Sequence, residues 1–173
     1  GTDCLENSAQ MCLDLGADRV TMHVPRASVA QMAPGGVAWE AMAAAFGNGL
    51  RQLIDAKLII GIENLHMNKG EPADERRGFG YLPDECMAWV RLLRERLDTP
   101  RVGLHLDLGH ARNNAPFSSE WTLGRWYATA GTEVVGYHLH QVNGSGNHHP
   151  IHAPFGPLIS LASFFWAWQT GQL

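Results

Sequence analysis

Four short apolar segments, separated by helical patterns, place the strongest constraint on the fold of this chain. The segments are RVTMHV (19–24), LIIGIEN (58–64), VGLHLDL (102–108) and EVVGYHLHQV (133–142), and each is brief and contains β-branched residues, as buried strands do. They follow one another at intervals of roughly 30 to 45 residues, which is the length of a strand–helix–strand unit. Strands connected in this way run parallel in one sheet, so the sequence predicts an α/β fold with about four parallel strands.

Helical patterns precede, separate and follow these strands. The expected helices cover residues 5–15, 37–56, 85–97, 118–130 and about 158–169, and Ser118 or Ser119 is the expected N-cap of the fourth. The polar stretch 66–80 and the Gly/His/Pro-rich stretch 143–157 have the composition of loops. No second domain is visible, and the sequence predicts a single domain over residues 1–173.

Charge and cysteine content exclude several classes of protein. The chain has 13 Lys and Arg against 17 Asp and Glu, so no basic field would attract nucleic acid. No apolar run reaches the ~18 residues of a membrane span, and the first residues lack a signal pattern. Cys4 and Cys12 lie too far apart on one expected helix to form a disulfide. We therefore expect a cytoplasmic protein without membrane contact that binds a small molecule, and a homo-oligomer is left open.

Histidines and carboxylates gather where the expected strands end. Seven of the 9 histidines fall between residues 105 and 152. In parallel α/β proteins the active site lies at the carboxyl ends of the strands, because the loops converge there. The side chains expected at or just beyond these ends are His23, Glu63, His105, Asp107, His110, His138 and His140.

An ordinary structural interpretation exists for each of these residues. Glu63 could form hydrogen bonds within a loop or cap a helix, Asp107 could cap the following helix, and His138 could be a core histidine. An ionised Glu63 after the apolar run 59–62 is nevertheless costly unless a cation compensates it. Carboxylates and imidazoles together suit one divalent metal ion such as Zn²⁺, Mn²⁺, Mg²⁺, Co²⁺ or Fe²⁺. His148 and His149 are expected in a solvated loop.

The motifs at these positions resemble the xylose-isomerase-like TIM barrels, a family that includes sugar-phosphate isomerases and epimerases and endonuclease IV. The matching stretches are TMHVP with His23, IGIEN with Glu63, GLHLDLGHA with Asp107 and His110, YHLHQ with His138, and HAPFGPLI with His152. The resemblance implies that Glu63, Asp107 and His138 are metal ligands. A complete barrel of this type has about 250 residues and eight strands. The four strands here correspond to the third through sixth, so the resemblance implies a partial barrel without the family's last glutamate ligand.

The function implied by the resemblance is that of a metal-dependent isomerase or epimerase, acting on a sugar or sugar-like carbonyl compound through an enediolate. Glu63 would act as an acid/base and His110 would bind substrate oxygen atoms, while His23, His140 and His152 would line the pocket. Two alternatives remain open: an endonuclease IV-like phosphodiester hydrolase and a non-catalytic barrel fragment. Pro150 occupies a position where endonuclease IV-like members carry an aspartate, which argues against the hydrolase.

Overall fold

The computed structural model describes residues 2–142, 148–149 and 159–172, and its central feature is an open parallel sheet. The strand order is β1 (Arg19–His23), β2 (Ile59–Glu63), β3 (Val102–Asp107) and β4 (Val134–His138), and all three neighbouring pairs are parallel. The main helices are α1 (Thr2–Asp14), α2 (Val37–Asp55), α3 (Pro83–Leu97), α5 (Leu123–Ala130) and α6 (Ile159–Gln169). The parallel α/β fold expected from the sequence is therefore confirmed.

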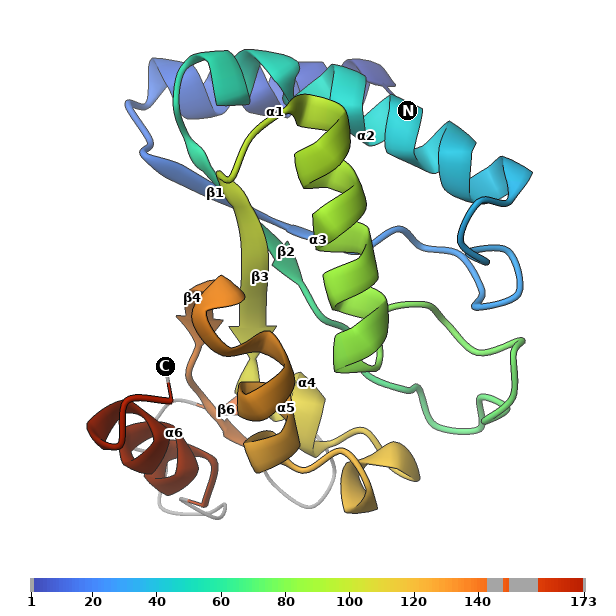
Figure 1. The fold of residues 1–173 in the computed structure, drawn as a ribbon, viewed down its shortest axis with the longest axis vertical. Helices are drawn as coiled ribbons and strands as arrows, with labels where there is room; N and C mark the ends of the chain where they lie inside the picture. The colour runs from blue at the N-terminus through green and yellow to red at the C-terminus, as the bar shows by residue number, and fades with distance from the viewer. Residues whose placement is uncertain (1, 143–147, 150–158, 173) are drawn as a thin grey trace.

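The helices form a layer whose neighbours follow chain order. α1 packs on α2, α2 on α3, α3 on α5 and α5 on α6, and α3 also contacts β2 and β3 (Figure 1). Ile60 and Ile62 of β2 and Leu104 of β3 are fully buried within the hydrophobic core, as is Trp89 of α3. Ile60 and Ile62 are two apart in sequence and share one face of the sheet, because side chains alternate along a strand. Leu104 is paired in register with Ile62 and lies on the same face. The alternate residues, Gly61 and Glu63 among them, belong to the opposite face.

This opposite face is polar, and glycine keeps part of it open. A Cβ atom added at Gly61 would lie 2.9 Å from the Cβ atom of His105, and one added at Gly136 would lie 2.6 Å from its Nδ1 atom. His105 therefore occupies space that side chains at these two positions would fill. Its Nδ1 atom is 3.2 Å from the hydroxyl oxygen of Thr21. Burial lowers the pKa of His105 to about 4, so its imidazole is neutral near pH 7.

Three boundaries differ from the sequence-based expectation. The helix expected over 118–130 is divided into η1 (Phe117–Ser119) and α5, and the N-cap is Thr122, whose hydroxyl accepts a hydrogen bond from the Arg125 amide. Ser118 and Ser119 are wrong as caps because they lie within the short η1 turn. The fourth strand ends at His138, and its expected remainder forms β5 (Gln141–Val142), which pairs antiparallel with β6 (His148–His149).

Two short helical elements lie next to the strands β3 and β4. A short helix, α4 (Leu108–Arg112), directly follows β3. η2 (Gly131–Glu133) connects α5 to β4. Within the described part of the chain, no helix is both long and apolar enough to span a membrane.

Candidate functional site

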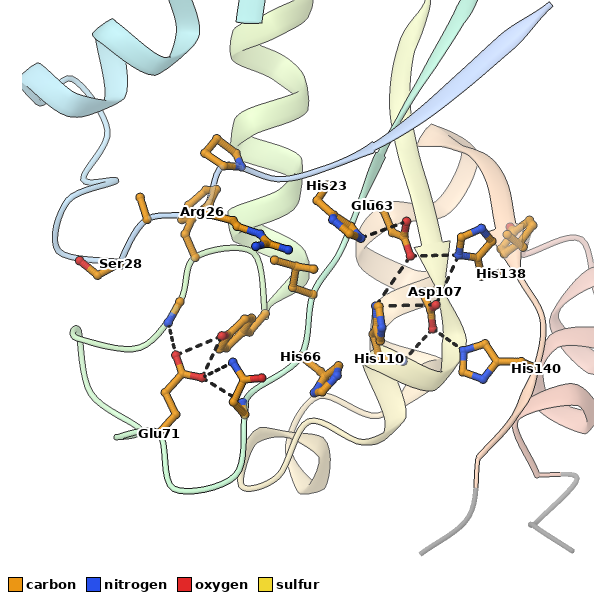
Figure 2. A pocket seen from close by; sticks show the side chains of 18 of the residues that line it. His23, Arg26, Ser28, Glu63, His66, Glu71, Asp107, His110, His138 and His140 are labelled. Atoms are coloured by element: carbon orange, nitrogen blue, oxygen red, sulfur yellow. Dashed lines mark hydrogen bonds and ion pairs between the residues drawn. The ribbon is translucent and has the colours of Figure 1, made fainter. Parts of the chain in front are cut away.

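The last residues of the four parallel strands meet at one edge of the sheet. His23, Glu63, Asp107 and His138 end β1, β2, β3 and β4, respectively. His23 is paired in register with Glu63, and Asp107 with His138. Figure 2 shows these side chains turned toward a shared space, with His110 and His140 beside them. The structure thus brings together the strand-end residues that the sequence singled out.

Glu63, Asp107 and His138 form the centre of this group. The Nδ1 atom of His138 lies 2.9 Å from Oε1 of Glu63 and 3.4 Å from Oδ2 of Asp107. One ligand atom from each of the three residues lies within 4.8 Å of the others. The carboxylates are buried, with Glu63 5% and Asp107 1% exposed, whereas the His138 side chain is about half exposed. Two buried acids therefore face one accessible imidazole.

The two carboxylates have different protonation behaviour. Burial raises the pKa of Glu63, the nearby charge of Asp107 adds to this effect, and His138 and His23 only partly oppose it. Burial also raises the pKa of Asp107, but hydrogen bonds from His140 and from the His110 amide outweigh burial and leave that pKa below its ordinary value. Asp107 is thus held as a carboxylate, while Glu63 is a more basic group than an ordinary glutamate.

The donor set fits a single divalent cation. It supplies two carboxylate oxygens and one imidazole nitrogen and contains no thiol. Donor atoms bound to one such ion at ~2.1 Å lie at most ~4 Å apart, so small side-chain movements would bring the three within reach. A cation would also compensate two buried negative charges, which are otherwise costly.

Asp107 combines a structural and a candidate ligand role through its two oxygens. Oδ1 accepts the His110 amide at 2.8 Å, which caps α4, and lies 2.9 Å from Nε2 of His140. Oδ2 is the oxygen that faces His138. The capping interpretation and the ligand interpretation of Asp107 are therefore compatible, because each uses a different oxygen.

Asn64 is a positioning residue that sequence analysis missed. It is completely buried, its Oδ1 accepts the Asp107 amide at 2.8 Å, and its Nδ2 donates to the Asp107 carbonyl at 3.2 Å. Its own carbonyl accepts a hydrogen bond from Nδ1 of His110 at 2.8 Å. The side chain thus continues the connection between β2 and β3 beyond their last paired residues, Glu63 and His105. Its place directly after a strand-end glutamate was the only signal in the sequence.

A cavity of about 1340 Å³ opens in front of these residues. His23, His110 and His140 line it, as expected for pocket residues, and so does His66, which sequence analysis missed. The His66 and His110 rings are 4.8 Å apart, and Nδ1 of His66 donates to the Met67 carbonyl at 2.9 Å. The His105 ring packs edge to face against the His138 ring, with the ring centroids 4.3 Å apart. His152, the remaining expected pocket residue, lies outside the described residues.

Replacing Glu63 by glutamine should stabilise the metal-free chain. Folding raises the pKa of Glu63, so at any pH above that raised pKa the charged form destabilises the folded state. Removing the charge should increase the free energy of unfolding by on the order of 1 kcal/mol, as removal of destabilising site residues commonly does. Urea unfolding at pH 7 with a chelator would measure it.

The matched control is Glu95→Gln, which removes an exposed carboxylate on α3 and should change the free energy of unfolding by less than about 0.5 kcal/mol. A Glu63→Gln chain that unfolds more easily than the parent would show that the hydrogen bond with His138 dominates over burial.

Comparison with known proteins gives one family and a consistent fold. A family model described as xylose isomerase-like TIM barrel matches residues 1–169. The structure is similar to a proposed xylose isomerase from Rhodospirillum rubrum, with a TM-score of 0.72 and 18% identity over 98% of this chain and 56% of that one. No match was found among curated proteins.

Two further solved structures have the same fold. A D-tagatose 3-epimerase-like protein has a TM-score of 0.61 and 17% identity over 97% of this chain and 58% of its own. D-allulose 3-epimerase from Methylomonas sp., solved in complex with D-allulose, has a TM-score of 0.61 and 17% identity over 99% of this chain and 52% of its own. The chain therefore spans little more than half the length of these structures.

Proposed function

The chain belongs to the xylose isomerase-like TIM barrel family, and from this premise we propose that it carries the metal centre of an isomerase or epimerase acting on a sugar or sugar-like carbonyl compound. Its open sheet of four parallel strands corresponds to part of such a barrel. One observation carries the proposal: Glu63, Asp107 and His138 converge at the strand ends, inside the cavity. The carbohydrate class is supported by the epimerases of similar fold.

In this proposal Glu63, Asp107 and His138 hold one divalent metal ion. When bound, such an ion polarises a substrate carbonyl and its neighbouring hydroxyl. Asp107 is suited to constant coordination because its pKa is lowered, and Asn64 holds its backbone in place from β2. The identity of the metal is left open among Zn²⁺, Mn²⁺, Mg²⁺, Co²⁺ and Fe²⁺, since all accept oxygen and nitrogen donors.

Glu63 is the proposed base. Its two oxygens face different partners, Oε1 facing His138 and Oε2 facing His23, so one oxygen could bind the metal ion while the other takes the proton. It would take the proton from the carbon next to the carbonyl, and the C–H electron pair would move into an enediolate of the sugar. Return of the proton to the neighbouring carbon, with transfer of the hydroxyl proton from one enediolate oxygen to the other, completes an isomerisation. Return to the same carbon from the opposite face, by a second acid, completes an epimerisation.

The histidines around Glu63 would bind and orient the substrate. Nδ1 of His110 must carry a proton because it bonds the Asn64 carbonyl, which can only accept. The ring is thereby fixed beside the metal-binding group, where it would contact substrate oxygen atoms. His23 and His140 line the same cavity and are proposed as further substrate contacts, as is His152 from the sequence.

Metal stoichiometry and proton exchange together test the function. The chelator-treated chain should bind one Mn²⁺ or Co²⁺ ion in calorimetry, and the loaded chain should exchange the proton next to the carbonyl of a ketose for deuterium in D₂O, seen by NMR. Absence of metal binding would favour a non-catalytic fragment. Two or three ions per chain with cleavage of abasic-site DNA would favour a phosphodiester hydrolase. Either result would overturn the proposal, as would one bound ion without exchange in any ketose.

A further inference from the structure

The cavity is larger than a monosaccharide needs. Ligand pockets for much larger drug-sized molecules measure about 300 to 1,000 Å³, and this cavity measures about 1340 Å³. It extends from the metal-binding group to a second wall formed by residues 25–28 and by parts of residues 65–81. A substrate whose carbonyl lies at Glu63 would therefore present its remaining carbons to this second wall.

Arg26 is the cation of this wall that has no ion-pair partner among the residues described by the structure. Figure 2 shows its guanidinium projecting into the cavity, on the side of His23 that faces Ser28. The side chain is exposed, and among the described residues no hydrogen bond or ion pair involves it. By contrast, the other arginine lining the cavity, Arg76, forms a two-pronged ion pair with Asp74. Arg26 therefore has its hydrogen-bond donors available to a ligand.

The carboxylate on this wall, Glu71, is already satisfied. Its oxygens accept hydrogen bonds from the Asn68 amide at 2.9 Å, from Nδ2 of Asn68 at 3.1 Å, and from the Tyr81 hydroxyl at 2.9 and 3.0 Å. The Gly78 amide also donates to it at 2.5 Å. These bonds hold Glu71 as part of the loop structure, and no ion pair joins it to Arg26 in the part of the chain that the structure describes.

The backbone on both sides of Arg26 is held by hydrogen bonds to distant segments. The Val24 amide donates to the Glu63 carbonyl at 3.2 Å, and the Phe79 amide donates to the Ala27 carbonyl at 2.9 Å. The next connection is the Val29 amide bonded to the Arg77 carbonyl at 3.0 Å. Arg26 therefore projects from an anchored loop that is connected directly to the strand carrying Glu63. An anchored backbone reduces the entropy lost when the side chain binds a ligand.

We propose that Arg26 binds an anionic group of the substrate, a phosphate or a carboxylate, so that the sugar of the proposed function is an acidic derivative. The guanidinium presents paired N–H donors that match the oxygens of either group. A neutral hydroxyl offers one oxygen instead of two or three and would gain no ionic attraction. The inference rests on the proposed function for the identity of the ligand as a sugar, and on the cavity wall for its charge.

Three six-carbon probes that differ only at C6 test the charge preference. D-Fructose, D-fructose 6-phosphate and D-fructuronate are titrated into the metal-free chain, and binding is followed by NMR or calorimetry. Arg26→Gln should weaken binding of the phosphate or the carboxylate by at least about tenfold, because a charge-assisted hydrogen bond is lost. D-Fructose binding should change by less than about twofold. The more strongly affected anion identifies the group that the site takes.

Arg91→Gln is the matched control, because it removes an exposed arginine from α3, outside the cavity. It should leave all three affinities unchanged. Equal binding of the three probes by the parent chain, or equal losses in Arg26→Gln and Arg91→Gln, would overturn the inference.

The two proposals fail in different ways. If the metal-loaded chain exchanges a ketose proton while Arg26→Gln leaves anion affinity unchanged, the proposed function stands and the anionic substrate is excluded. If Arg26 governs anion affinity but no metal binds, the charge preference stands and the isomerase proposal is excluded.

Discussion

The substitution Asp107→Asn should abolish tight binding of a divalent metal and leave the fold intact. The substitution keeps an oxygen that can accept the His110 amide, so the cap of α4 is retained. It removes the buried charge that faces His138. Loss of even an outer partner of a metal ligand costs 10- to 100-fold in affinity, so loss of this charge should raise the dissociation constant by at least about 100-fold. Calorimetric titration of the chelator-treated chain with Mn²⁺ or Co²⁺ would measure it.

Asp55→Asn is the matched control for this experiment. Asp55 is an exposed carboxylate at the end of α2, away from the strand ends that carry the site. Its replacement should change neither metal affinity nor the circular dichroism spectrum. An Asp107→Asn chain that keeps the metal content of the parent would show that Asp107 is only a helix cap and would remove the basis of the proposed metal centre.

Asn64→Ala should produce the second large effect, a loss of both stability and metal affinity. The substitution leaves the buried Asp107 amide and carbonyl without the partners that Asn64 supplies. An unsatisfied buried polar group costs about 1 to 3 kcal/mol, so the free energy of unfolding should fall by about 2 to 4 kcal/mol. Because Asp107 is no longer tied to β2, metal affinity should fall as well.

The two consequences of Asn64→Ala are measured separately. Urea unfolding of the metal-free chain gives the change in stability, and calorimetry at a temperature where the variant is folded gives the change in affinity. Asn48→Ala, at an exposed position on α2, serves as the control and should lie within about 0.5 kcal/mol of the parent. If the two variants unfold at the same urea concentration, Asn64 does not position Asp107.

The local sequence pattern was sufficient to predict the strands, but it was not sufficient to predict where some helices begin. The run from 59 to 62 is apolar and ends at Glu63, so both the strand and its last residue could be predicted. The start of α5 could not, because Ser118, Ser119 and Thr122 are all acceptable caps in sequence. Only the observed course of the chain, with the η1 turn before Thr122, selects among them.

Some residues of the candidate site could likewise be predicted from sequence, and others could not. Glu63, Asp107 and His138 could be placed from sequence because each ends a strand, and parallel strands end at one edge of the sheet. Asn64 and Arg26 could not, since their roles depend on partners or open space supplied by other segments. Asn64 meets Asp107 across 43 residues of sequence, and Arg26 faces a cavity that is also lined by parts of residues 65–81.

The sequence was enough to predict a parallel α/β chain with two carboxylates and two histidines at its strand ends, because alternation along a strand is a local property and long helical connections between strands indicate parallel pairing. Packing of the folded chain sets which oxygen of Asp107 faces His138 and which side chain holds that aspartate, and it leaves Arg26 without an ion pair to any residue that the structure describes. These outcomes depend on contacts between segments distant in sequence, and such contacts form only when the helices and loops pack around the sheet.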